Sequence, residues 1–147
     1  MVQMISEIIN KTCELKTRDE KVAYLKNNDS TALREVLVAM YDKKKIKFLI
    51  PNTPPPYTPS TAVENQGAMY REARKLRYLA DGFGGENLSK VKREQIFIQI
   101  LETVHREDAK LLVDMITQKG YKGLTVKQIN EAFGDIITNE EKNGEEE

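Results

Sequence analysis

The sequence has no tryptophan, a single cysteine and a single histidine. One cysteine excludes an intramolecular disulfide, and Cys13 with His105 supplies too few ligands for a zinc site. Such sparing use of cysteine is typical of a reducing cytoplasm. The longest apolar run, residues 36–41, is far shorter than the ~20 residues that span a bilayer, and the first residues lack the basic and apolar segments of a secretory signal. We therefore expect a soluble protein without metal, cofactor or membrane contact.

Proline is also scarce, and it is confined to one place. All five prolines lie between Pro51 and Pro59, and because proline is excluded from helix interiors, the rest of the chain is free to be helical. The 147 residues match the size of one domain. We expect a single helical domain over residues 1–137, in which residues 51–60 form a proline-rich connector. A disordered acidic tail is expected over residues 138–147.

Apolar side chains recur at intervals of three and four residues along most of the chain, which is typical of amphipathic helices. Capping-box patterns at residues 17–20 and 125–128 mark two helix starts. The spacing predicts further helices over 66–80 and 88–104, and the latter, apolar nearly all round from its middle onward, is expected to be the central buried helix. The sequence thus predicts an all-α fold, an orthogonal helical bundle of about six helices with one proline-rich extended loop.

The positive charges gather in the middle of a chain whose net charge is zero. Residues 41–93 carry a net charge of +6, and residues 138–147 carry −4. Arginine beside tyrosine, with additional lysines, suits contacts to phosphates and stacking on bases. The predicted nucleic-acid or anion face comprises Tyr70, Arg71, Arg74, Lys75, Arg77, Tyr78, Lys90, Lys92 and Arg93. The alternative is an ordinary solvated helix face, and the acidic tail could fold back and screen it.

The proline-rich segment is a second candidate site. Its residues Pro54, Pro55, Pro56 and Tyr57 could dock onto a partner in the polyproline II conformation, with the tyrosine as an aromatic anchor. The alternative is that the segment wraps the domain and buries Tyr57 in the domain's own core.

No pattern in the sequence predicts catalysis. Cys13 and His105 could meet in space, but a small buried cysteine and a histidine at the start of its helix are the simpler explanation. Glu107 and Asp108 could serve acid–base chemistry, yet acidic residues in a first helical turn are ordinary partners of the helix dipole. The glycines over residues 82–85 lack the ending of a phosphate-binding loop. We predict no enzyme, and no catalytic, cofactor-binding or metal-binding residue.

Several strings, read together, resemble one family. They occur in order from about residue 30 to residue 137: Lys45-Ile-Lys-Phe48 with Pro54-Pro-Pro-Tyr57, Tyr70-Arg-Glu-Ala-Arg74-Lys, and the strings at 93–102, 105–112, 121–125 and 131–133. This set resembles a family of small uncharacterised proteins of large contractile-tailed bacteriophages, including those that infect marine cyanobacteria. The resemblance implies a phage origin and the cytoplasm of the infected bacterial host. It implies no activity.

The sequence therefore predicts a non-enzymatic, phage-encoded accessory protein that binds another macromolecule of the phage or host during infection, with a protein partner preferred. Direct nucleic-acid binding through the basic region 71–93 is the alternative. A minor virion component is a further one. A hydrolase that uses His105 and neighbouring carboxylates is the function with the weakest support from the sequence.

Overall fold

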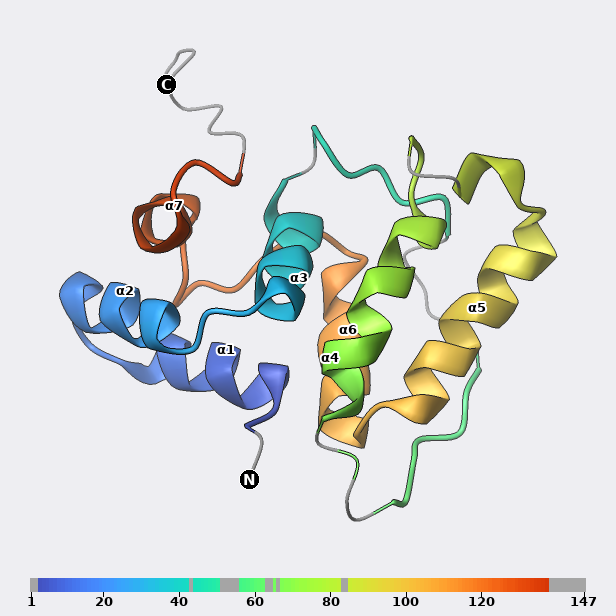
Figure 1. Cartoon of the computed structure of the whole chain (residues 1–147), viewed down its shortest axis with the longest axis horizontal. Coiled ribbons are helices and arrows are strands. Elements are labelled where there is room, and N and C mark those ends of the chain that lie inside the picture. Colours follow the sequence, from blue (N-terminus) through green and yellow to red (C-terminus); the bar gives the residue numbers. More distant parts are fainter. Residues whose placement is uncertain are drawn as a thin grey trace.

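The computed structural model describes residues 3–42, 44–50, 56–62, 65, 67–82 and 85–137. In these ranges the chain is all-α, as predicted, and β-structure is limited to one isolated bridge between Phe48 and Ala80 (Figure 1). Seven α-helices are present there, against about six predicted, together with two 3₁₀ helices. The elements are α1 (Ile5–Glu14), α2 (Arg18–Asn27), α3 (Thr31–Tyr41), α4 (Ala68–Glu72), η1 (Ala73–Leu79), η2 (Gly85–Asn87), α5 (Lys90–Thr103), α6 (Arg106–Met115) and α7 (Val126–Phe133).

Two parts of the predicted architecture fall largely outside these ranges. Residues 51–55 of the proline-rich connector and residues 138–147 of the expected tail are not among the described residues. The orthogonal arrangement of the helices and the extended proline-rich loop stay predictions. No helix in the described part of the chain is long and apolar enough to cross a membrane.

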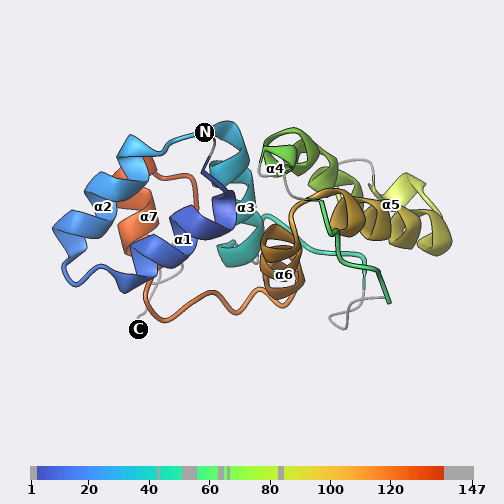
Figure 2. The same ribbon diagram turned by 90° about the horizontal axis from the view of Figure 1, so that it is seen from below.

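The helices do not lie in space in the order of the chain. Figures 1 and 2 show α1, α2 and α7 at one end of the molecule and α5 at the other, with α3, α4 and α6 between them. Among the described elements, α2 and α7 share the most extensive contact. Arg18 forms an ion pair with Glu131 across them, and Lys21 Nζ donates a hydrogen bond to the Gly123 carbonyl at 2.5 Å. An N-terminal helix and the last helix therefore close one end of the fold together.

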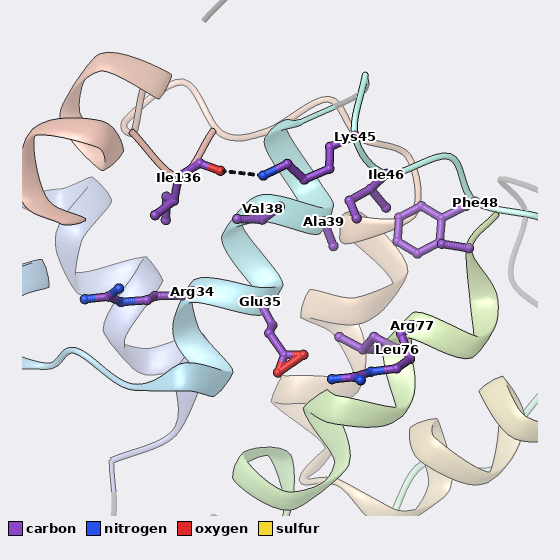
Figure 3. Close-up of a pocket in the computed structure, with 11 residues that line it drawn as sticks. Arg34, Glu35, Val38, Ala39, Lys45, Ile46, Phe48, Leu76, Arg77 and Ile136 are labelled. Carbon is purple, nitrogen blue, oxygen red and sulfur yellow. Dashed lines mark hydrogen bonds between the residues drawn. The ribbon is translucent and has the colours of Figure 1, made fainter. Parts of the chain in front are cut away.

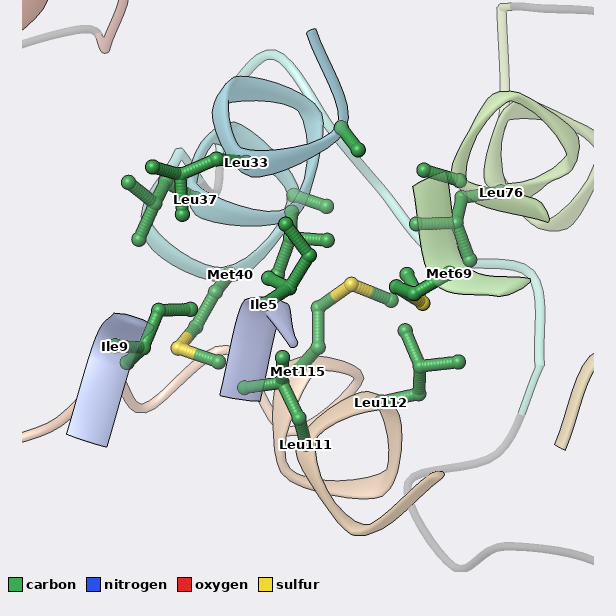
Figure 4. Close-up of a cluster of buried hydrophobic side chains, with 14 of the residues drawn as sticks. Ile5, Ile9, Leu33, Leu37, Met40, Met69, Leu76, Leu111, Leu112 and Met115 are labelled. Carbon is green, nitrogen blue, oxygen red and sulfur yellow. The ribbon is translucent and has the colours of Figure 1, made fainter. Parts of the chain in front are cut away.

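A single cluster of buried apolar side chains joins the two ends. Its members come mainly from α1, α3, α4, η1, α5 and α6, and those from α1, α3, α4, η1 and α6 that Figure 4 labels point toward one another. The apolar stripe expected for the third helix is confirmed, because all its members are buried: Ala32, Leu33, Val36, Leu37 and Met40. The stripe expected for the first helix is confirmed in part: Met4, Ile5, Ile8 and Ile9 are buried, whereas Leu15, which follows the helix, is only half-buried. Burial of this kind contributes about 1.5–3 kcal/mol per large side chain.

The prediction that residues 88–104 form the central buried helix is wrong. The helix exists as α5, but it lies at the outer end of the molecule, and its most extensive contacts with other described elements are those with α6 and η1. Its buried residues are Phe97, Ile100 and Leu101, whereas Val91 is 64% exposed. Apolar residues around a helix show that it is capable of burial on several sides, but they do not supply the neighbours that would cover those sides.

The helix predicted over residues 66–80 is present in an altered form. It begins as the short α4 and continues as the 3₁₀ helix η1. The buried residues of η1 are Ala73, Leu76 and Leu79, which are spaced by three. Side chains at this spacing lie directly above one another in a 3₁₀ helix, which has three residues per turn. The tighter winding therefore keeps all three on the buried side, where a regular α-helix would rotate them away.

Both predicted capping boxes are confirmed. The Thr17 hydroxyl accepts from the Glu20 backbone N–H at 3.2 Å, and Glu20 accepts from the Thr17 N–H in return. Thr125 and Gln128 make the same pair of bonds at the start of α7. His105 stands at the predicted helix boundary, where its Nδ1 accepts from the Glu107 N–H at 3.1 Å. These side chains satisfy amide groups that the first turn of a helix leaves without partners.

Candidate functional site

A cavity of about 420 Å³ opens between α3, η1 and the loop that follows α3 (Figure 3). It falls within the size range of ligand and side-chain binding pockets. Four separate stretches of the chain form its walls. The lining residues are Arg34, Glu35, Val38, Ala39, Lys45, Ile46, Phe48, Leu76, Arg77, Ala80 and Ile136.

Backbone hydrogen bonds hold the walls of the cavity in place. The loop after α3 runs antiparallel to the end of η1, where the Leu49 N–H donates to the Leu79 carbonyl at 2.7 Å beside the Phe48–Ala80 bridge. From the other side, Gln118 Nε2 donates to the carbonyls of Ala39 and Ile46, each at 2.9 Å. The shape of the cavity is therefore fixed by contacts that do not involve its open mouth.

The charged side chains of the cavity lie at its rim. Arg34 is held by two 2.7 Å hydrogen bonds to the Asp29 carboxylate, and its guanidinium lies 5.1 Å from the centre of the Phe133 ring. On the far side of the mouth, Arg77 faces Glu35 (Figure 3). Burial raises the pKa of the Glu35 carboxyl, and the positive charge of Arg77 partly opposes this shift.

Lys45 completes the rim. Its Nζ contacts the Ile136 carbonyl at 3.5 Å, a long hydrogen bond. Among the described residues, neither Lys45 Nζ nor the Arg77 guanidinium forms an ion pair within 4.0 Å, although the Asp42 carboxylate accepts a hydrogen bond from the Lys45 backbone N–H at 2.9 Å. The rim thus carries three cationic side chains and one acidic one.

The residues of the predicted nucleic-acid face are only partly brought together. Arg71, Arg74 and Arg77 are exposed and follow one another at three-residue intervals along α4 and η1. Since η1 has three residues per turn, the last two lie on one edge of the helix, about 6 Å apart along its axis. We call Arg71, Arg74 and Arg77 the arginine stripe. Tyr78 is 43% exposed beside it, and Lys75 is ion-paired with Glu72 at 3.0 Å.

Other members of that predicted face serve the fold or lie on another helix. The Tyr70 hydroxyl donates to the Gln3 carbonyl at 2.6 Å. Arg93 Nη1 donates to the carbonyls of Gly85 and Leu88 at 2.9 and 2.6 Å, which ties the start of α5 to η2. Lys90 and Lys92 are exposed in the first turn of α5.

Only the second half of the predicted docking loop is described. Pro54 and Pro55 lie outside the described residues, and Pro56 is exposed. Tyr57 is half-buried and packs against the hydrophobic cluster. The Thr58 N–H donates to the Glu102 carboxylate at 2.8 Å, so this stretch is held against the end of α5.

The chain matches the model of one protein family, described as a family of unknown function (DUF6433), over residues 8–121. The protein belongs to this family. The matched DUF6433 region begins within α1 and ends before α7. It contains the arginine stripe and every lining residue of the cavity except Ile136. No curated protein and no solved structure matches this DUF6433 chain.

Two candidate catalytic residues of this DUF6433 protein, Cys13 and Asp108, are partly or fully buried. Cys13 is half-buried at the end of α1, and burial raises the pKa of its thiol, which disfavours the reactive thiolate. Asp108 is fully buried and accepts from the Ser6 backbone N–H at 2.9 Å. Within the described ranges, no group of three or more histidine, cysteine, aspartate or glutamate side chains could hold a metal ion.

The sequence did not reveal the cavity. Its lining residues extend from position 34 to position 136, and each is of a common type in an ordinary helical or loop context. The one local signal was the excess of positive charge over residues 41–93, which includes Lys45 and Arg77 but does not place them at one opening.

Proposed function

We propose that this DUF6433 protein is a non-enzymatic accessory protein of a bacteriophage that binds a protein of the phage or host in the cytoplasm of the infected cell. The cavity between α3 and η1 makes the contact. The phage setting is supported by the resemblance of the strings from Lys45-Ile-Lys-Phe48 to Glu131-Ala-Phe133 to proteins of large contractile-tailed phages.

One observation carries this proposal, namely a preformed apolar cavity whose rim is charged. Binding sites generally combine an apolar interior with a few polar groups that orient the ligand. Walls fixed by backbone hydrogen bonds reduce the entropy lost when a partner docks.

The test is a comparison of two matched tryptophan variants in infected cells. Val38→Trp places a large ring at the cavity, because Val38 lines it. Val91→Trp makes the same change at the exposed position on α5, at the outer end of the molecule. Tagged wild-type and variant proteins are crosslinked in the cell, purified and analysed by quantitative mass spectrometry. A partner that is lost from Val38→Trp and retained by Val91→Trp is the expected result. Identical partner profiles for the two variants would refute the role of the cavity.

Nucleic-acid binding is a second candidate function, and the arginine stripe supports it. Its three exposed arginines are spaced by three residues, and Tyr78 lies beside them. The arginines could contact successive phosphates while a base stacks on the tyrosine ring. Arg77 belongs both to this stripe and to the cavity rim.

A further inference from the structure

We infer that the occupant of the cavity is an acidic segment of the partner protein, with a bulky apolar side chain in the cavity and carboxylates against the rim. The inference rests on the proposed function and specifies the chemistry of its partner. It depends on three features of the site: its apolar interior, its unbalanced rim charge and the geometry of the rim.

The interior requires an apolar group. Seven of the lining residues are apolar, and they converge from α3, the following loop, η1 and the stretch after α7: Val38, Ala39, Ile46, Phe48, Leu76, Ala80 and Ile136. Polar atoms of an occupant would lose their hydrogen bonds to water in such surroundings and gain none in return. A leucine, methionine or aromatic side chain has no such cost and is therefore the group that we expect inside.

The rim requires negative charge. Arg34 already has a carboxylate partner, Asp29, and this pairing together with the Phe133 ring keeps its guanidinium in place. Lys45 and Arg77 have no ion-pair partner within 4.0 Å among the described residues. Glu35 is the one acidic side chain among the described lining residues, and its negative charge offsets one of these two positive charges. These three side chains leave a net charge of about +1, so an acidic occupant would balance it, whereas a basic occupant would be repelled.

The positions of the two cations favour a peptide. In Figure 3, Lys45 and Arg77 lie on opposite sides of the mouth with the apolar wall between them. A chain segment that crosses the mouth places one side chain inward and its neighbours over the rim, so acidic residues on both sides of an apolar one meet both cations. A nucleic acid fits this site less well, because the polar edges of a base would be buried against apolar walls and Glu35 would face its phosphates.

Selection of peptides on the full-length protein tests the inference. A random twelve-residue library displayed on yeast is sorted for binding to the wild-type protein, then counter-sorted for loss of binding to Val38→Trp and retention of binding to Val91→Trp. We expect the surviving peptides to share a bulky apolar residue flanked by Asp or Glu. Survivors that are neutral or basic, or a sort that yields no survivors, would overturn the inference.

Charge reversal at the rim provides an independent measurement. In Lys45→Glu/Arg77→Glu, the affinity for a selected peptide should fall at least about tenfold, since each exchange replaces an attraction with a repulsion. The control Lys16→Glu/Lys26→Glu makes equal changes at exposed positions on the α1–α2 side and should retain affinity within about twofold. Equal losses in both variants would mean general electrostatics and would contradict the inference. Displacement of the peptide by a single-stranded oligonucleotide that itself fails to bind Val38→Trp would identify nucleic acid as the occupant instead.

The two proposals can fail separately. A partner captured from infected cells that depends on Val38, combined with selected peptides that lack acidic residues, would leave the proposed function intact and remove the acidic occupant. Acidic peptides that bind at the cavity, without any Val38-dependent partner in infected cells, would support the preference of the cavity for acidic segments and would contradict the proposed function.

Discussion

Asp108 on α6 accepts a hydrogen bond from the backbone N–H of Ser6 on α1 at 2.9 Å, across 102 positions of the sequence. Asp108 is fully buried and Ser6 is nearly so. The carboxylate satisfies an amide in the first turn of α1 that has no partner within its own helix, so one side chain caps a distant helix and joins it to the centre of the fold.

Removal of this carboxylate should destabilise the protein. In Asp108→Ala the buried Ser6 N–H loses its acceptor, and we expect the free energy of unfolding to fall by about 1–3 kcal/mol. Urea unfolding followed by circular dichroism measures the loss. Glu107→Ala is the control, because Glu107 makes only a partly exposed 3.5 Å contact with Lys110, and it should change stability by no more than about 0.5 kcal/mol.

The same residue should give the protein a specific dependence on pH. Burial raises the pKa of the Asp108 carboxyl above its ordinary value of 3.8, while hydrogen bonding from Ser6 and the nearby His105 oppose the shift. A folded-state pKa above the unfolded one means that the native protein binds the proton more tightly. The part of the stability that comes from the tighter binding of this proton is therefore complete below pH 3.8 and is lost as the pH rises through the folded-state pKa.

Asp108→Asn isolates this contribution, because the amide does not titrate in this range. The stability of the wild-type protein relative to Asp108→Asn should increase as the pH is lowered from about 7 to about 4. Urea unfolding of both proteins at each pH gives the difference, in which the titration of groups remote from Asp108 cancels. A difference that stays constant or changes in the opposite direction would disprove the raised pKa.

Two glycines with the same backbone requirement should tolerate alanine differently. Gly120 has a φ of +72° and Gly82 a φ of +89°, so both substitutions cost about 1 kcal/mol from the left-handed conformation alone. A Cβ at Gly120 would also lie 2.6 Å from the Tyr41 ring, whereas one at Gly82 would meet nothing within 4 Å.

The Tyr41 ring cannot move aside easily. Its hydroxyl accepts from the Tyr121 N–H at 2.8 Å and donates to the Leu124 carbonyl at 2.7 Å. Gly120→Ala should therefore lower the free energy of unfolding by at least about 1 kcal/mol more than Gly82→Ala. Thermal unfolding of the pair measures this difference, and equal losses would show that the ring gives way.

Tyr57 should contribute to stability less than a core aromatic residue does. It is half-buried against the hydrophobic cluster, so we expect Tyr57→Ala to cost about 1–2 kcal/mol, between the values for surface and core positions. Phe97→Ala, at a fully buried position, and Val91→Ala, at an exposed one, bracket the measurement. An unchanged denaturation midpoint for Tyr57→Ala would contradict this prediction and would make Tyr57 a candidate for contact with a partner protein.

The arginine stripe gives a quantitative expectation for nucleic acid. Three phosphate contacts imply a salt slope of about −2 for single strands, so affinity should fall roughly twentyfold between ~50 and ~200 mM salt. The triple variant Arg71→Ala/Arg74→Ala/Arg77→Ala should lose at least about tenfold in affinity at low salt. Fluorescence anisotropy with a labelled oligonucleotide measures both effects. An equal loss in Lys16→Ala/Lys26→Ala/Lys119→Ala, or no binding at low salt, would exclude the stripe as a specific site.

The sequence predicts those parts of this fold that depend on near neighbours. The capping boxes at Thr17 and Thr125 could be recognised because their partners are three residues away, and the stripe of α3 because its period is that of a helix. The placement of α5 could not, since exposure of Val91 depends on which other elements reach it. The 3₁₀ winding of η1 has a signal in hindsight, because Ala73, Leu76 and Leu79 are spaced by three.

The candidate sites follow the same division. Arg71, Arg74 and Arg77 lie within one continuous stretch, so local composition is enough to propose them as a nucleic-acid face, and this proposal stays a prediction. The carbonyl partners of Arg93, Gly85 and Leu88, become apparent only in three dimensions. In the sequence, Asp108 looks like any acidic residue in the first turn of a helix. Its hydrogen bond with Ser6, 102 positions away, appears only in the structure. The cavity depends on Ile136 meeting Lys45, and no local pattern carries that information.

Because α2 lies against α7, the N-terminal helices complete their packing only after α7 has been made. Arg18 and its partner Glu131 are separated by 113 positions, so at ~5–20 residues per second a ribosome would leave α2 without α7 for on the order of ten seconds. During that time the face of α2 that contacts α7 in the finished fold is open to solvent and to chaperones. A helix made late therefore covers one that was made early.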